Sequence, residues 1–239
     1  MINLIMPMGG AGSRFSKEQR PKPLIELQGK PFFYWATQSI VKFLSSVNII
    51  FVVLQDHIDR FSIDQEIHNF YPSANIIIIP QVLNGAVLTC LEGVKGVNNK
   101  SPLIFNDCDH MFICKEFYNF CENNSLDGAL LTFESTEPKY SFLECDEKGN
   151  VMRTVEKKAI STHAICGAYY FKDKDTFALS AENYLRECAY SEYFMSGVYN
   201  IMAKQNMKIS YFRTDIHIPF GTPEELDLAR KDSRIRAVE

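Results

Sequence analysis

The sequence predicts an α/β fold: a Rossmann-like, mixed but mostly parallel sheet with helices on both faces. In the first half of the chain, short β-rich runs alternate with amphipathic segments of helix length, which is the order of βαβ units. One run, Asn48–Leu54, is apolar at consecutive positions, as expected for a strand buried on both faces. Several strands follow closely in the second half, and they make the predicted sheet mixed.

The first half supplies four predicted strands joined by three helices. The strands are expected at 3–6, 48–54, 76–79 and 102–105, and the helices at 31–44, 58–70 and 84–94. The first helix is indicated by Phe33, Ala36, Ile40 and Phe43, whose spacing of three or four residues forms one apolar face. This β-α-β-α-β-α-β order favours parallel pairing with helical crossovers.

The second half is predicted to hold five strands and three helices. The strands are expected at 128–133, 141–144, 151–155, 164–171 and 208–213, and two of the helices at 175–187 and 192–206. Thr222 begins the last helix as its N-cap, with Pro223 at the first helical position and acidic residues in the first turn. No repeat, charge run or flexible linker interrupts the chain, so we expect one domain over residues 1–239.

Composition narrows the possible partners. The chain has 239 residues, 46% of them hydrophobic, and a net charge of −4, which is typical of a globular protein and argues against nucleic acid as a partner. It has no signal peptide pattern and no apolar run near the roughly 20 residues that span a membrane. Seven singly scattered cysteines predict free thiols and a cytoplasmic location, with Cys108 and Cys166 as packing residues. Oligomeric state is not indicated.

The most informative segment is a glycine-rich loop directly after the first strand. Three glycines in four positions bring the backbone close to a ligand, and successive N–H groups can then bind phosphate. Arg14 adds a planar guanidinium that can donate hydrogen bonds to phosphate oxygens. Lys22, between Pro21 and Pro23, adds a compact positive charge. Arg14 and Lys22 are therefore the candidate catalytic residues, and the candidate nucleotide-binding residues here are Met8, Gly9, Gly10, Ala11, Gly12 and Ser13.

Two other phosphate-binding loops do not fit. A dinucleotide-binding loop needs G-x-G-x-x-G, but from Gly10 the third glycine position is Phe15. A Walker A loop needs G-K-[ST], which is absent from the segment. A plain connecting turn would leave the lysine between two prolines unexplained.

Two acidic residues follow the fourth strand. Asp107 and Asp109 come at its carboxyl end, the edge at which open α/β sheets bind ligands. Mg²⁺ prefers one or two carboxylates together with phosphate oxygens and water. The pair predicts a Mg²⁺ cofactor beside a triphosphate, with Asp107 also near the nucleotide and His110 as a structural residue.

At these motifs the chain resembles the nucleoside-triphosphate transferases, the family of sugar-nucleotide pyrophosphorylases and cytidylyltransferases. Residues 9–14 and 21–24 match its signatures G-G-x-G-[ST]-R and P-K-P-L, and a looser likeness extends over nearly the whole chain. The resemblance implies the nucleotide-diphospho-sugar transferase fold, with a nucleotide-binding half at about 1–125 and an acceptor-binding half at about 126–239. It also implies that Asp109 is the better match to the metal-binding aspartate.

The resemblance extends to further site residues. Residues 81–86 resemble the segment that contacts the nucleobase, which implies base recognition by Gln81, Gly85 and Ala86. Glu156 and Lys157 resemble an E-K-P element in which the glutamate holds an acceptor hydroxyl and the lysine its phosphate, although Lys158 replaces the proline. Gly167 matches a glycine that lets the acceptor approach the backbone.

The C-terminal motif departs from the family at one position. Residues 221–226 resemble G-T-P-E-[DE]-L, but many members carry a second metal-binding aspartate two residues before that glycine, where this chain has Pro219. Either one carboxylate site suffices, or Asp215 or His217 takes over the role. Of these residues, Asp215 is the one we predict as a metal ligand.

The resemblance implies Mg²⁺-dependent transfer of an NMP unit from a nucleoside triphosphate to a small phosphorylated acceptor, with release of pyrophosphate. CTP is the expected donor, and the chain looks like the cytidylyltransferases of bacterial capsule synthesis, whose acceptors include sugar phosphates and phosphorylated glutamine. A phosphate acceptor is already largely dianionic at neutral pH, so no general base is expected. The alternatives are uridylyl or thymidylyl transfer to a sugar 1-phosphate, a glycosyltransferase with Asp107 and Asp109 as its metal motif, and a non-catalytic regulatory relative.

Overall fold

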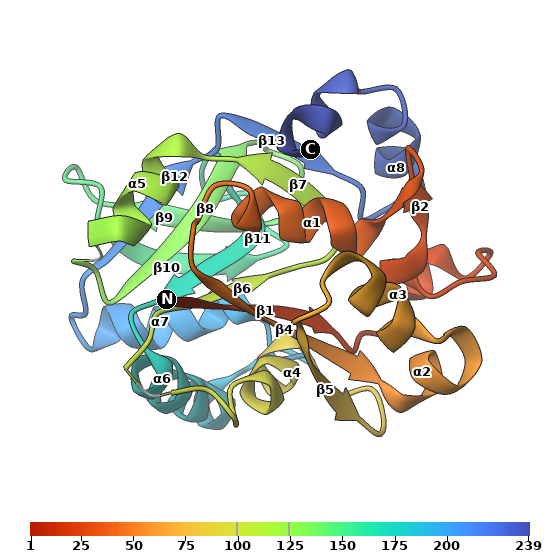
Figure 1. The fold of residues 1–239 in the computed structure, drawn as a ribbon. Coiled ribbons are helices and arrows are strands. Elements are labelled where there is room, and N and C mark those ends of the chain that lie inside the picture. The colour runs from red at the N-terminus through yellow and green to blue at the C-terminus, as the bar shows by residue number, and fades with distance from the viewer. Residues whose placement is uncertain (99, 124) are drawn as a thin grey trace.

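A nine-stranded sheet forms the centre of the protein in the computed structural model, which describes residues 1–98, 100–123 and 125–239 (Figure 1). Seven strands follow the order β10-β9-β11-β6-β1-β4-β5, and β8 joins β11 to β12. Their bounds are β1 Ile2–Met8, β4 Val47–Leu54, β5 Asn75–Ile79, β6 Leu103–Asn106, β8 Gly128–Glu134, β9 Ser141–Cys145, β10 Val151–Glu156, β11 His163–Phe171 and β12 Ile209–Arg213.

The sheet is mixed, as predicted. β6, β1, β4 and β5 pair in parallel, and β12 pairs in parallel with β8. β11 runs antiparallel to β6, β8 and β9, and β10 runs antiparallel to β9. The four parallel strands are those of the first half of the chain, so their carboxyl ends meet at one edge of the sheet.

Helices cover both faces of the sheet, which confirms the predicted fold class (Figure 1). Side chains of β1 alternate between two apolar clusters, with Leu4 and Met6 in one and Ile5 in the other. The first cluster includes residues of α1 Phe32–Val41, α3 Ile63–Phe70, α5 Lys115–Asn123 and α8 Pro223–Ala229. The second includes residues of α4 Ala86–Gly93, α6 Lys174–Glu187 and α7 Met195–Lys204.

Several features differ from the sequence expectation. The helix predicted at 58–70 is two helices, α2 Gln55–Phe61 and α3, because Ser62 between them adopts a left-handed conformation with φ of 50°. Helix α5 was not predicted. A two-stranded antiparallel ribbon of β7 His110–Ile113 and β13 Ile216–Pro219 was not predicted either, and it joins the acidic segment to the C-terminal motif.

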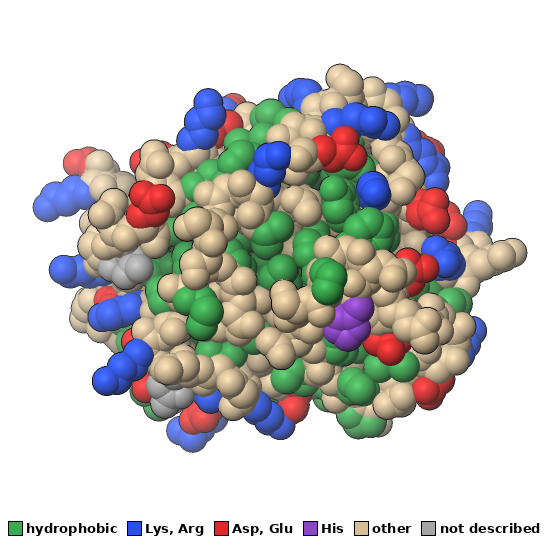
Figure 2. All heavy atoms as spheres, in the orientation of Figure 1, with side chains coloured by type: hydrophobic (Ala, Val, Ile, Leu, Met, Phe, Trp, Pro, Cys, Tyr) green, Lys and Arg blue, Asp and Glu red, His purple; other side chains and the backbone are tan. Residues whose placement is uncertain are grey.

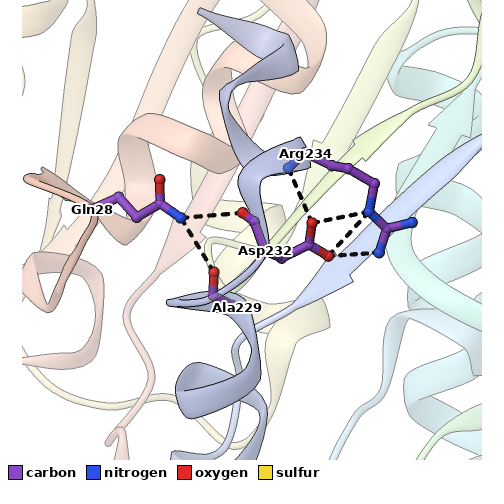
Figure 3. A network of polar contacts seen from close by, with 4 residues as sticks. All are labelled: Gln28, Ala229, Asp232 and Arg234. Carbon is purple, nitrogen blue, oxygen red and sulfur yellow. Dashed lines mark hydrogen bonds and ion pairs between the residues drawn. The ribbon is translucent and has the colours of Figure 1, made fainter.

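A small hairpin ties the lysine segment to the C-terminus. The strands β2 Glu26–Leu27 and β3 Lys30–Pro31 follow the short 3₁₀ helix η2 Lys22–Leu24. Gln28, at the tip of the hairpin, donates to the backbone carbonyl groups of Ala229 and Asp232, at 3.5 and 3.1 Å (Figure 3). The Asp232 carboxylate accepts from Arg234 Nε at 2.9 Å, in the final 3₁₀ helix η3 Ser233–Val238.

The surface carries charges of both signs. Figure 2 shows basic and acidic side chains interspersed around the rim of one face, with apolar atoms between them. Among the helices that the structure describes, none is long and apolar enough to cross a membrane.

Candidate functional site

Two adjoining cavities lie where the carboxyl ends of β1 and β6 meet. The larger has a volume of about 570 Å³ and is lined by the glycine-rich loop, Lys22, residues 82–86 and the 107–109 segment. The smaller, of about 160 Å³, is lined by residues of β7, β9, β11 and the C-terminal motif. Both cavities include Arg14, Asp107, Asp109 and Gly221 in their linings, so the two spaces meet at these four residues.

The glycine-rich loop has glycines for specific reasons. Gly12 has φ of 61°, and a Cβ there would lie 3.2 Å from Cβ of Lys22. A Cβ on Gly9 would come within 2.5 Å of the Ile79 side chain. Gly10 has open space where its Cβ would be, among the described atoms, so its backbone faces the larger cavity unobstructed. The loop can therefore accept an anionic group against its backbone.

Lys22 and Asp109 form an ion pair in the lining of the larger cavity. Lys22 Nζ lies 2.9 Å from Asp109 Oδ2, and the two side chains are only 27% and 19% exposed. Burial favours the neutral form of Asp109, but the charge and hydrogen bond of Lys22 together hold its pKa below the ordinary value. Burial likewise opposes the charge on Lys22, but Asp109 raises its pKa. Both groups are charged at neutral pH.

Asp107 is in a different electrostatic state. Burial, followed by repulsion from Asp109, raises the pKa of Asp107 to about 7, although Lys22 acts in the opposite direction. Its backbone N–H donates to the Gly167 carbonyl group at 2.9 Å. A cation bound beside both carboxylates would relieve the repulsion that raises this pKa.

Both carboxylates lie against glycines that leave them room. A Cβ on Gly167, which has φ of 98°, would lie 2.8 Å from Asp107 Oδ2. A Cβ on Gly221 would lie 2.5 Å from Asp109 Oδ2. Two carboxylates held in this way, facing a cavity with a phosphate-binding loop, suit a hard divalent cation such as Mg²⁺.

Glu225 holds the Gly221 segment in place. Its Oε2 accepts from the Gly221 N–H at 3.0 Å, and its Oε1 accepts from the Tyr140 hydroxyl at 2.5 Å and pairs with Lys139 at 2.9 Å. Thr222 caps α8 by accepting from the Glu225 N–H at 3.2 Å, as the sequence predicted. Sequence reasoning assigned Glu225 only to the first turn of a helix and missed this role.

The far wall of the larger cavity joins two distant segments. Gly85 has φ of 104°, and its ideal Cβ would lie 2.4 Å from the backbone nitrogen of Tyr193. Backbone hydrogen bonds from Tyr193 to Asn84, at 3.3 Å, and from Val87 to Tyr193, at 3.2 Å, fix this contact. The loop before α7 thereby contributes Glu192 and Phe194 to the lining. No motif marks this loop, so the sequence could not indicate it.

The predicted acceptor residues are divided between the two cavities. Lys157 lines the larger cavity, with its Nζ 5.2 Å from the centroid of the Phe194 ring, and Gly167 lines the smaller. Glu156 is outside both linings, because its carboxylate accepts hydrogen bonds from the hydroxyl groups of Ser196 and Ser141, the latter at 2.6 Å. Ser141 lines the smaller cavity.

Two of the predicted nucleotide-binding side chains are not in the lining. Met8 is 2% exposed in β1, where its side chain packs into the core. Gln81 is exposed to solvent outside the larger cavity, whereas the neighbouring residues 82–86 line it. The remaining predictions in this group, Gly9 to Ser13, Gly85, Ala86 and Asp107, all line the cavity.

The structure does not bring Asp215, which was predicted as a metal ligand, to the acidic pair. Asp215 Oδ2 accepts from the backbone N–H of Lys115 at 2.8 Å and so binds the first residue of α5. The register of the β7–β13 ribbon pairs Ile216 with Ile113 and Pro219 with His110. Asp215 and Asp109 therefore lie beyond opposite ends of the ribbon, roughly 17 Å apart at about 3.4 Å per residue.

Comparisons with known proteins identify the family and the fold. The family model for nucleotidyl transferases matches residues 2–226. A nucleoside-diphosphate-sugar pyrophosphorylase from Vibrio cholerae superposes with a TM-score of 0.82, at 21% identity over 96% of this chain and 100% of that one. An inositol-1-phosphate CTP transferase from T. maritima gives 0.77, at 13% identity over 99% and 94% of the two chains.

A third structure, of UDP-glucose pyrophosphorylase with UDP-glucose, superposes with a TM-score of 0.74, at 18% identity over 97% of this chain and 98% of that one. At these identities the structural matches show the fold. A search of curated protein sequences finds no match. The family match spans nearly the whole chain, and the chain therefore belongs to the nucleotidyl transferase family.

Proposed function

We propose that this member of the nucleotidyl transferase family transfers CMP from CTP to a small phosphorylated acceptor and releases pyrophosphate. The observation that carries the proposal is the junction of two cavities at Arg14, Asp107 and Asp109. A transferase must hold two substrates with their reacting atoms in contact. Here the cavity with the phosphate-binding loop meets a second cavity at a pair of carboxylates and a guanidinium.

The larger cavity has the size and lining for the nucleotide. Its volume, about 570 Å³, falls within the range usual for small-molecule sites. The glycine-rich loop and Lys22 would bind the triphosphate, and residues 82–86 would surround the nucleoside. Asp109 and Asp107 would hold Mg²⁺, which supplies charge neutralisation for the phosphates when bound.

The smaller cavity would receive the acceptor. Arg14 and Lys139 bring positive charge to its wall, and Gly167 leaves the backbone open to a ligand. Glu156 would act indirectly, by orienting the Ser141 hydroxyl that lines this cavity. Lys157, on the wall of the larger cavity, would bind the acceptor phosphate.

The reaction needs positioning more than proton transfer. An oxygen of the acceptor phosphate forms a bond to the α-phosphorus, the bond between that phosphorus and the bridging oxygen to the β-phosphate breaks, and pyrophosphate leaves with the electron pair. Because the acceptor phosphate is largely dianionic near neutral pH, no side chain has to remove a proton. Lys22 and Arg14 stabilise the charge that develops on the transferred phosphoryl group and on the leaving pyrophosphate.

The choice of CTP rests on similarity to compact cytidylyltransferases, and the T. maritima neighbour is named as a CTP transferase. We place the acceptor among sugar phosphates and phosphorylated small molecules such as phosphoglutamine, used in the cytoplasm for a bacterial capsule or surface polysaccharide precursor. Uridylyl or thymidylyl transfer to a sugar 1-phosphate is the competing specificity, because another neighbour is named as UDP-glucose pyrophosphorylase.

Thermal unfolding with separate nucleotides tests the donor without knowledge of the acceptor. The purified protein is heated with Mg²⁺ and CTP, UTP, dTTP, ATP or GTP, each with and without the metal. A ligand at 100 times its Kd stabilises by about 2.7 kcal/mol, or roughly 5–10 °C for a chain of this length. We expect the largest Mg²⁺-dependent shift with CTP. A larger shift with UTP or dTTP would refute CTP, and no shift with any nucleotide would refute the transferase proposal.

A further inference from the structure

Two histidines beside the acidic pair have ring nitrogens that are buried without hydrogen bonds among the described residues. His110 is 2% exposed in β7, and His217 in β13 is half-buried. None of their four ring nitrogens has a hydrogen-bond partner among the described residues. A buried polar group without a partner costs roughly 1–3 kcal/mol, so such groups usually have a water, an ion or a ligand as a partner. Four such ring nitrogens close together indicate a site that binds an ion or a ligand.

The fold brings both rings to one side of the β7–β13 ribbon. His217 pairs with Phe112, and His110 lies two residues before Phe112 on the same strand, so all three side chains share a face. The two imidazole centroids lie 5.5 Å apart. The faces of the rings are covered by aromatic neighbours, His110 by Phe112 at 5.6 Å and His217 by Phe133 at 4.1 Å. These contacts leave the nitrogens, which lie in the ring plane, to bind elsewhere.

Cys166 completes the group from the central sheet. Its thiol and one nitrogen of each histidine all lie within 4.8 Å of one another. Cys166 lies in β11 where the register against β8 shifts, between Ile165 and Tyr169, and such irregularities re-aim side chains near functional sites. The sequence predicted Cys166 only as a packing residue.

We propose that His110, His217 and Cys166 bind a zinc-type divalent ion, at a site distinct from the Asp107–Asp109 pair. Two imidazoles and one thiolate are a ligand set suited to Zn²⁺, and three protein ligands with an open fourth position are typical of reactive rather than structural sites. The ligand atoms of a tetrahedral zinc site lie about 3.4–3.7 Å apart, so the three groups, now within 4.8 Å, need to close by at most about 1.4 Å. Side-chain rotation can supply that movement.

The fourth position would face the smaller cavity. All three residues line it, together with Asp107 and Asp109, whose negative charge favours a bound cation. On binding, the Cys166 thiol loses its proton to solvent and the thiolate coordinates the ion. A water molecule or a donor atom of the molecule in the cavity would fill the open position. This binding is independent of nucleotidyl transfer and is tested without it.

Cobalt(II) is the probe, because it takes zinc sites and is visible spectroscopically. Protein freed of any affinity tag and of bound metal is titrated with Co²⁺ under reducing conditions. We expect one tightly bound Co²⁺ per chain, visible d–d bands of a tetrahedral ion and a near-ultraviolet thiolate-to-cobalt charge-transfer band, with both sets of bands removed by one equivalent of Zn²⁺. A wild-type titration without the thiolate band, up to millimolar Co²⁺, overturns the proposal.

Matched variants identify the ligands. Cys166→Ser should lose the charge-transfer band, whereas Cys145→Ser, which changes a half-buried thiol elsewhere, should keep it. His217→Asn should weaken Co²⁺ binding at least about 10-fold, while the surface control His68→Asn should not. Asp109→Asn should retain the band, because the carboxylate is not a ligand. A band that persists in folded Cys166→Ser, or disappears in Asp109→Asn, would contradict the assignment.

Discussion

Replacing Gly221 with alanine tests whether the position of Asp109 controls the reaction. The ideal Cβ at position 221 lies 2.5 Å from Asp109 Oδ2, the oxygen that also pairs with Lys22 at 2.9 Å. Gly221 does not have a positive φ, so alanine adds no backbone strain. The added methyl group therefore acts through its contact with the carboxylate.

The size of the effect follows from the overlap. Ordinary contact begins near 3.4 Å, so the carboxylate must move by about 0.9 Å away from Gly221. A displacement of about 1 Å at a reacting centre can cost about 10²-fold in rate. We expect Gly221→Ala to lower kcat by about 10²-fold and to raise the Mg²⁺ concentration needed for half-maximal activity.

The assay is pyrophosphate release measured against Mg²⁺ concentration, with the melting temperature as a check on folding. Gly96→Ala is the matched control, because no described atom lies within 4 Å of its ideal Cβ and it lines neither cavity. If Gly221→Ala turned over within about 3-fold of wild type, the placement of Asp109 as a required metal ligand would be refuted.

Three further predictions follow from the same contacts. Lys22→Ala should lower kcat by about 10²–10³-fold, as for removal of one preorganised donor, and wild-type turnover in steady-state assays would exclude the role given to Lys22. Gly85→Ala should lower the melting temperature by several degrees and weaken nucleotide binding. The reason is that the added Cβ would lie 2.4 Å from the backbone nitrogen of Tyr193, at a residue whose φ is 104°. An unchanged melting curve would contradict this prediction. The third prediction concerns Asp107 without metal, whose pKa is raised to about 7 in the folded state. The unfolded state loses the same proton near pH 4, so between about pH 4 and 7 the folded state binds more protons than the unfolded state. The contribution of Asp107 to stability therefore falls as the pH rises through this range. Asp107→Asn should remove that contribution and raise the free energy of unfolding at pH 7.5 by up to about 4 kcal/mol. A lower value in metal-free denaturant titrations would show that the charge on Asp107 is stabilising.

Much of the fold follows from local patterns. The apolar run in β4 and the alternation of strands with amphipathic helices are local properties, and they indicated the parallel half of the sheet correctly. The N-cap at Thr222 is also local, because its partner Glu225 is three residues away. The split at Ser62 was missed, because a left-handed residue that is not glycine has no reliable sequence signal.

The parts of the site that are formed by short sequence motifs could be predicted. Each of these motifs spans only a few residues: the glycine-rich loop, the segment around Lys22 and the acidic pair. The parallel neighbours β1 and β6 bring them together. The loop containing Glu192 and Phe194 was missed, because it reaches the cavity only through backbone contacts with residues 84–87.

Asp215 was predicted to lie beside the acidic pair because the sequence does not show the register of β13. That register places it beside α5 and places His217 next to His110 instead. The side chain that reaches the smaller cavity is therefore that of His217, two residues after Asp215.

The most direct test of the transferase proposal follows the α-phosphorus. The protein is incubated with Mg²⁺, CTP labelled at the α-phosphate and a panel of phosphorylated acceptors, and the products are separated beside a parallel Lys22→Ala reaction. The proposal predicts that one acceptor takes up the label as a CMP conjugate, with one pyrophosphate released per transfer and little product from the variant. Label that stays in CTP with every acceptor, or that appears only as free CMP at the same rate in both proteins, would contradict it.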